Sequence, residues 1–224
     1  MSTRTRTRTN LTSIVRFDRT ERVVHWANAT LFLTLMATGA VLYLGDLAAF
    51  VGRRNLVEHV HVYAGLALPI PLVLGLVLRS GRQFRADVKA FARWTADDRR
   101  WWHKRTRPRA QLGKFNPGQK LNATFVGAAI VVMLASGSIM YWFQFFSDDV
   151  RTGATFVHDW FAFGIWCSVI GHIAFALSDS DALSSMVRGP VPVSWALAKR
   201  PRWYAETHNG HERAIPSEEH ANAG

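Results

Sequence analysis

One apolar stretch, from Thr155 to Ser178, carries two histidines, His158 and His172, fourteen residues apart. On an α-helix this spacing corresponds to about 21 Å along the axis and returns to within about 40° of the starting direction. A helix that crosses a membrane here would present one imidazole near each surface, on one face. Ionisable groups in a membrane span are costly and usually functional, although a histidine can also simply bond a neighbouring helix. This arrangement favours axial ligation of two stacked metal cofactors, for which the rest of the chain must supply the partner ligands.

Further histidine candidates lie near the start of two earlier apolar stretches. His25 opens the first stretch, and His59 and His61 open the second. Residues two apart on a helix point about 200° away from each other, so one cofactor cannot use both His59 and His61. His61 lies deeper and is followed one turn later by Gly65, which would leave room beside it; we therefore predict His61 as the ligand and His59 as a solvated residue at the membrane surface. The remaining histidines are set aside because they lie in a basic loop or a polar tail: His103, His208, His211 and His220.

The elements that must position these residues are four apolar spans, at about residues 23–44, 59–78, 121–146 and 155–178. Each is long enough to cross a bilayer as a helix. The predicted fold is therefore an all-α integral membrane protein, a four-transmembrane-helix bundle with amphipathic surface segments. We predict three parts: a disordered basic arm over 1–21, the membrane domain over 22–204 and a polar, mobile tail over 205–224.

The basic residues lie between the apolar spans and predict the orientation of the chain. The net charge is +11, and nearly all Lys and Arg fall in the first arm, in the loop 79–120 and after residue 178. These segments lie on one side after four crossings, and their excess of Lys and Arg identifies that side as cytoplasmic. Both termini are then cytoplasmic, and the charge needs no nucleic-acid partner. Membrane lipid is the expected partner of the loop, whose tryptophans suit an interfacial helix: Trp94, Trp101 and Trp102.

With this orientation the four histidines sort into two pairs. His25 begins an outward helix and His172 comes late in an inward one, so both lie near the cytoplasmic face. His61 and His158 each begin an inward helix, so both lie near the outer face. Two ligands at each level fall short of a zinc site but predict two b-type haems, each held by two histidines, which favours electron transfer over oxygen chemistry. The sequence has no CxxCH motif for covalent haem attachment, and its single cysteine, Cys167, excludes an iron–sulfur cluster held by this chain alone.

The chain resembles the cytochrome b (gamma) subunit of membrane-bound formate dehydrogenase from about Arg16 to Glu206. The resemblance rests on the following features: Asp18–Trp26, His61–Gly65, Gly113–Lys120, the spacing of His158 and His172, and Pro201–Tyr204. The loop Gly113–Lys120 is the most specific of these, because related hydrogenase cytochromes share the haem histidines and lack it. Two positions depart from the family pattern: Val62 stands where proline is usual, and Asp159 begins a segment where small residues are usual.

The resemblance implies a three-subunit enzyme in a bacterial inner (cytoplasmic) membrane. A molybdenum- or tungsten-pterin (alpha) subunit would oxidise formate, and an iron–sulfur (beta) subunit would pass electrons to the outer haem. This chain would be the quinone-reducing electron-transfer subunit and would perform no formate chemistry. The resemblance places the quinone beside the inner haem ligand, at His172, Asn116, Gly118 and Gln119. The amide and backbone N–H groups of the loop could also serve a quinone carbonyl by their own chemistry, or the Asn-Pro-Gly sequence could only turn the chain.

Two other functions fit the sequence. A hydrogenase or another respiratory oxidoreductase uses a cytochrome b with the same four-helix core, and the copurifying subunits would distinguish it. A haem-free membrane anchor or small transporter would lack the absorption spectrum of low-spin haem.

Overall fold

The computed structural model describes residues 12–213 of the 224-residue chain. These residues divide into two compact units. The first, here called the bundle unit, comprises Asp18–Arg93 and Gly118–Ser180. The second, here called the strand unit, comprises the described residues of 1–17, 94–117 and 181–224.

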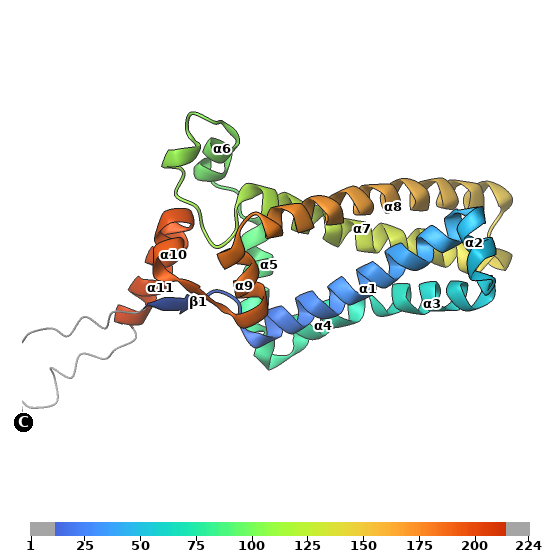
Figure 1. Ribbon diagram of the computed structural model, residues 1–224, viewed down its shortest axis with the longest axis horizontal. Coiled ribbons are helices and arrows are strands. Elements are labelled where there is room, and N and C mark those ends of the chain that lie inside the picture. Colours follow the sequence, from blue (N-terminus) through green and yellow to red (C-terminus); the bar gives the residue numbers. More distant parts are fainter. Residues whose placement is uncertain (1–11, 214–224) are drawn as a thin grey trace, which may run out of the picture. The chain divides into compact units, whose positions relative to one another are not determined.

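Four long helical spans form the bundle unit, and they run side by side along its length (Figure 1). They are α1 (Arg19–Tyr43), α3 (Arg54–Ala67) continued by α4 (Pro69–Val77), α7 (Pro117–Tyr141) and α8 (Asp148–Leu177). Each span is long and apolar enough to cross a membrane. Large apolar side chains point outward from them; Phe163 is 62% exposed and Phe175 is 73% exposed. Apolar outer surfaces and internally satisfied backbones are what helices in lipid require, so the predicted all-α membrane bundle is confirmed.

Local side-chain chemistry determines where these helices begin and break. Asp18 and Glu21 form a capping box: the Glu21 N–H donates to the Asp18 carboxylate (2.8 Å), and the Asp18 N–H donates to the Glu21 carboxylate (2.6 Å). Helix α1 therefore begins at Arg19. Pro69 has no N–H to donate, which interrupts the hydrogen-bond ladder and separates α3 from α4.

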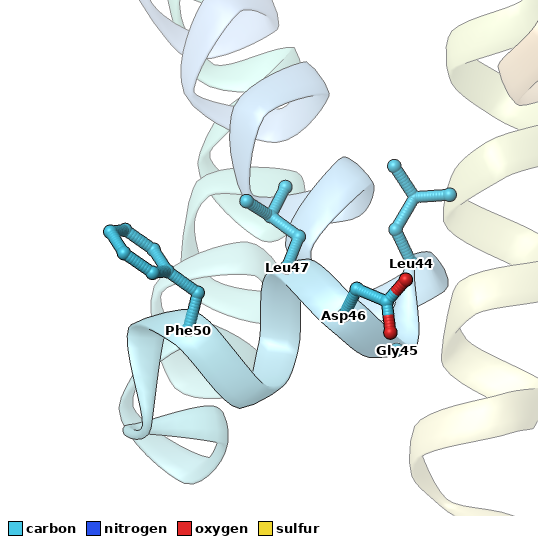
Figure 2. Close-up of a pocket in the computed structure, with 5 residues that line it drawn as sticks. All are labelled: Leu44, Gly45, Asp46, Leu47 and Phe50. Atoms are coloured by element: carbon cyan, nitrogen blue, oxygen red, sulfur yellow. The ribbon is translucent and has the colours of Figure 1, made fainter.

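Short elements connect the long helices of the bundle unit: α2 (Gly45–Val51), η1 (Arg79–Gly81), α5 (Arg82–Ala92) and η3 (Phe143–Phe145). A surface hollow of about 440 Å³ lies over the segment that leads from α1 into α2. Figure 2 shows its lining, in which Leu47 and Phe50 project from the same side of α2 while the Asp46 carboxylate lies beside Leu44 and Gly45. No histidine lines this hollow, so it is separate from the residues considered next.

The strand unit is built around one short sheet, in which β1 (Ser13–Val15) pairs antiparallel with β2 (Pro190–Pro192). Gly189, at φ +107°, turns its carbonyl to accept from the backbone N–H groups of Arg16 and Phe17. The unit's small core is Val191, Trp195, Ala196 and Trp203. Its other elements are α6 (Ala96–Trp102), η2 (Arg107–Arg109), α9 (Ser180–Arg188), α10 (Val193–Lys199) and α11 (Pro201–Arg213).

Both predicted terminal segments differ in part from the structure. Instead of an arm that extends to residue 21, residues 13–15 form β1 and α1 begins at Arg19. The reason is backbone pairing with β2 and the capping box of Asp18. Where the tail was predicted to begin at residue 205, α11 continues to Arg213. Residues 1–11 of the arm and 214–224 of the tail lie outside the described residues.

Candidate functional site

The bundle unit brings the four candidate histidines together as two facing pairs. His25 on α1 faces His172 on α8, with ring centres 6.0 Å apart and ring planes inclined by 46°. His61 on α3 faces His158 on α8, with ring centres 6.4 Å apart and ring planes inclined by 62°. Helix α1 begins at the end of the bundle where α8 ends (Figure 1), which places His25 level with the later histidine of α8. The pairs share one helix, and about 21 Å of its length separates them.

The ring spacing in both pairs suits one metal ion held between two imidazoles. A metal–imidazole bond is about 2.0–2.1 Å long and the ring nitrogen lies about 1.1 Å from the ring centre, so opposed axial imidazoles have centres about 6.3 Å apart. The observed spacings, 6.0 Å and 6.4 Å, bracket this value. No cluster of three or more His, Cys, Asp or Glu able to hold a metal ion occurs among the described residues. Two ligands per site do not complete a zinc centre, whereas haem iron needs only two axial ligands from protein.

A hydroxyl group on a neighbouring helix approaches each histidine of the second pair. The Thr38 hydroxyl on α1 lies 2.9 Å from Nδ1 of His61, and the Ser136 hydroxyl on α7 lies 3.0 Å from Nδ1 of His158. Both contacts are partly buried, and Ser136 itself is only 4% exposed. Such bonds fix the orientation of a metal-binding imidazole and leave its other nitrogen for the metal.

A glycine follows each of these hydroxyl residues and lies against the same ring. A Cβ atom at Gly39 would come 3.3 Å from Cε1 of His61, and a Cβ atom at Gly137 would come 3.3 Å from Cε1 of His158. Both distances are tighter than nine in ten real Cβ contacts. The missing side chains therefore let each ring seat closely against the neighbouring helix. At Gly65, which the sequence predicts to leave room beside His61, a Cβ would meet only Leu35 Cδ2 within 4 Å, at 3.8 Å, so this glycine does not lie against the His61 ring.

The first pair is held differently. Nδ1 of His25 is buried and has no hydrogen-bond partner among the described residues. The Trp26 ring lies edge-on to His25, with centres 5.2 Å apart. One turn before His172 on α8, the Ser168 hydroxyl donates to the Asn122 side chain on α7 (2.6 Å) and ties these two helices together.

Neither pair includes any of the other histidines whose side chains the structure describes. His59 is exposed, and its Nδ1 lies 2.6 Å from the Asn55 carbonyl of its own helix, which leaves its ring on the surface of α3. His103 follows α6 in the strand unit, and His208 stacks on Tyr204 in α11. The side chains of the two remaining histidines, His211 and His220, lie outside those that the structure describes.

The structure anchors the loop Gly113–Lys120 at both ends. Within the strand unit the Lys114 carbonyl accepts from Arg16 (3.3 Å) and from Arg200 (3.2 Å). Within the bundle unit the buried Lys120 ammonium donates to the Arg93 carbonyl (2.6 Å). The predicted quinone residues of the loop are all half-buried: Asn116 precedes α7, and Gly118 and Gln119 lie in its first turn.

Sequence reasoning missed the two hydroxyl residues, Thr38 and Ser136. A signal for them exists in the sequence. Each is a hydroxyl residue followed by glycine, and each precedes a predicted ligand by a similar interval: 23 residues from Thr38 to His61 and 22 residues from Ser136 to His158. The repeat reflects two antiparallel helix pairs, α1 with α3 and α7 with α8.

Comparison with known proteins gives a consistent result. The family model of prokaryotic cytochrome b561 matches residues 16–189. A formate dehydrogenase cytochrome b556 subunit of Haemophilus influenzae is 27% identical, over 88% of this chain and 84% of that protein. The cytochrome b556(fdo) subunit of Escherichia coli is 25% identical, over 90% and 96%, and the nitrate-inducible cytochrome b556(Fdn) subunit is 24% identical, over 86% and 91%. These matches confirm the resemblance that the sequence motifs indicated.

Proposed function

The chain belongs to the prokaryotic cytochrome b561 family. We propose that it is the membrane cytochrome b subunit of a formate dehydrogenase. In this role it carries electrons from an iron–sulfur subunit through two b-type haems to membrane quinone. The observation that supports this proposal most is the presence of two pairs of facing histidines, on α1, α3 and α8. Relatives named as formate dehydrogenase cytochrome b556 subunits, matched over most of their length, supply the choice of complex.

Four side chains would hold the two haems: His25 with His172, and His61 with His158. Haem supplies a one-electron redox centre when bound, and two axial imidazoles leave no open position for oxygen on its iron. The role of this chain is then to hold both groups rigidly in a low-dielectric bundle and to shield them from water. Helix α8 supplies one ligand to each site, so its rigidity fixes the separation of the two centres.

The orientation that we propose follows from the charge distribution. Nearly all Lys and Arg fall in segments that lie on one side after four crossings, and the cytoplasmic side carries such an excess. The pair His25 and His172 is then the inner one, and the pair His61 and His158 the outer one. Both termini are cytoplasmic in this arrangement, and electrons enter at the outer pair.

The proposed quinone site rests on the resemblance to formate dehydrogenase cytochrome b subunits. This resemblance assigns quinone binding to Asn116, Gly118, Gln119 and His172. Amide and backbone N–H groups are the donors that a quinone carbonyl requires. Iron–sulfur and molybdenum- or tungsten-pterin subunits are the proposed partners, and no formate chemistry is assigned to this chain.

Purification of the tagged chain from its native membrane tests the assignment. We expect iron–sulfur and pterin subunits to copurify, and formate to reduce quinone in the isolated complex. Copurification of hydrogenase subunits instead would select the alternative of a hydrogenase cytochrome b, which uses the same histidine core. A purified chain without haem absorption would contradict both and favour a haem-free anchor or transporter.

A further inference from the structure

Thr38 and Ser136 have no assigned role in the function proposed above. We propose that both are positioning residues of the outer haem site: each hydroxyl accepts a hydrogen bond from Nδ1–H of one ligand, His61 or His158, and so presents Nε2 of that ring to the iron. The inference rests on the proposed function, because it concerns residues behind the proposed ligands. It adds a second layer of side chains that controls the tautomer, the orientation and the electron density of both rings.

The direction of the hydrogen bond follows from counting protons at Thr38. A hydroxyl group has one hydrogen to donate. The Thr38 hydroxyl lies 2.7 Å from the Thr34 carbonyl, one turn earlier on α1, and 2.9 Å from Nδ1 of His61. A carbonyl can only accept, so the hydroxyl donates to Thr34 and accepts from the ring. Nδ1 of His61 then carries the proton, and Nε2 keeps its lone pair for a metal.

Ser136 repeats this arrangement on a different helix. Its hydroxyl lies 2.8 Å from the Val132 carbonyl and 3.0 Å from Nδ1 of His158. The same count makes the hydroxyl an acceptor from Nδ1–H of His158. Two unrelated helices thus supply the same group at the same ring atom, each beside a glycine that lets the ring approach (Gly39 and Gly137). Because both rings of one pair are held in this way, each of them keeps an unprotonated Nε2 for a metal.

Donation to a carbonyl one turn earlier does not by itself explain these residues. Thr34 donates to the Thr30 carbonyl (2.9 Å) and Thr124 donates to the Lys120 carbonyl (2.9 Å), with the geometry common for threonine in membrane helices. Thr38 and Ser136 differ by their second contact, to a ligand ring. Thr34 and Thr124 are therefore matched controls on the same two helices.

The hydrogen bonds predict a chemical difference between the two haem sites. An acceptor at Nδ1–H makes an imidazole a stronger base and a better donor to the metal. Stronger donation stabilises ferric over ferrous iron and lowers the reduction potential. On the inner side, Nδ1 of His25 has no such partner among the described residues. The asymmetry favours electron flow from the outer site to the inner site, the direction that the proposed function requires.

The test uses the whole purified complex and four variants: Thr38→Val, Ser136→Ala, and the hydroxyl-retaining Thr38→Ser and Ser136→Thr. The measurements are redox titration of each haem, electron paramagnetic resonance of the ferric low-spin signals, and the rate of haem transfer to apomyoglobin. We expect Thr38→Val and Ser136→Ala to raise the potential of the outer haem, to shift its ferric signal and to weaken its binding on the order of 10- to 100-fold. The inner haem should be unchanged in potential and signal.

The hydroxyl-retaining variants and the controls separate this role from packing. Thr38→Ser and Ser136→Thr should keep the wild-type potential, and Thr34→Val and Thr124→Val should leave both haems as in the wild type. An unchanged potential and ferric signal of the outer haem in Thr38→Val and Ser136→Ala would overturn the proposal. If Thr38→Val accumulates without haem, Thr38→Ser decides: wild-type properties support the hydroxyl role, and an equal loss overturns it. A wild-type chain that contains no haem would instead reject the proposed function itself.

Discussion

Gly39→Ala is the substitution whose effect the structure predicts most fully. A Cβ at this position would lie 3.3 Å from Cε1 and 3.8 Å from Nδ1 of His61, where ordinary contacts range from 3.4 to 4 Å. The ring must retreat by a few tenths of an ångström, which also lengthens its 2.9 Å contact with the Thr38 hydroxyl. The change therefore acts on a proposed haem ligand without touching the haem-binding atom.

The expected magnitude follows from the overpacking. Overpacking a tight site costs about 1–3 kcal/mol. Alanine in place of glycine favours a helix by about 1 kcal/mol, but this gain is the same with and without haem and cancels in the haem affinity. The overpacking cost falls on the haem-bound state, in which the position of the ring is fixed, and corresponds to a loss of outer-haem affinity of about 5- to 150-fold. Gly137→Ala should behave alike, because its Cβ would lie 3.3 Å from Cε1 of His158.

Haem content per chain and the rate of haem release to apomyoglobin measure the effect. Gly65→Ala is the matched control on α3, since its Cβ meets only Leu35 Cδ2 at the ordinary distance of 3.8 Å. Gly127→Ala on α7 is a second control, because nothing lies within 4 Å of its Cβ. Both controls should keep wild-type haem content. Equal haem release from Gly39→Ala and Gly65→Ala would refute the argument that Gly39 seats the His61 ring.

Three further predictions concern the ligands, the quinone and the charge that moves. His61→Ala should remove the outer haem while His59→Ala, whose ring lies on the surface of α3, leaves both; two haems in His61→Ala would reverse the assignment. Asn116→Ala should slow quinone reduction with haem content intact, whereas loss of both haems would show that this residue only shapes the loop. Each electron that moves inward against an inside-negative potential of 100 mV costs about 2.3 kcal/mol. The rate of quinone reduction by formate should therefore fall under such a potential and recover with an uncoupler. A rate that does not depend on the potential would contradict the proposed orientation.

The histidine pairs could be predicted because they depend on two simple periodicities. Helical rise and rotation place His158 and His172 on one face of α8, and the excess of Lys and Arg assigns a depth to each helix end. Neither step needs the packing between helices. The facing rings of the structure follow from those two regularities.

The residues behind the ligands could not be predicted in the same way. Whether Thr38 or Gly65 lies beside His61 depends on the register and rotation of α1 against α3, which periodicity along one helix does not determine. Sequence reasoning considered only Gly65, on the same helix as His61, whereas in the structure Gly39 of the neighbouring helix lies against the His61 ring. A search for hydroxyl–glycine pairs finds Thr38 and Ser136 together with Ser80 and Thr152, and only the interval of 22 to 23 residues to a predicted ligand distinguishes the first two.

Helix ends also depart from the apolar spans for a physical reason. Hydropathy detects the part of a helix that lies in lipid, whereas capping and dipole interactions determine where the helix itself begins. Helix α8 begins at Asp148, where two acidic residues, Asp148 and Asp149, occupy the first turn and favour a helix N-terminus. Helix α7 ends at Tyr141, and the apolar residues that follow form the turn η3.

The central claim is that the four histidines form two haem sites, one from His25 and His172 and the other from His61 and His158. The most direct test is the haem stoichiometry and optical redox spectrum of the four single alanine variants. We predict two haems per wild-type chain and one in each variant. His25→Ala and His172→Ala should lose the same spectral component, and His61→Ala and His158→Ala should lose the other. Loss of different components by the two members of one pair, or two haems retained in any of the four variants, would contradict the account.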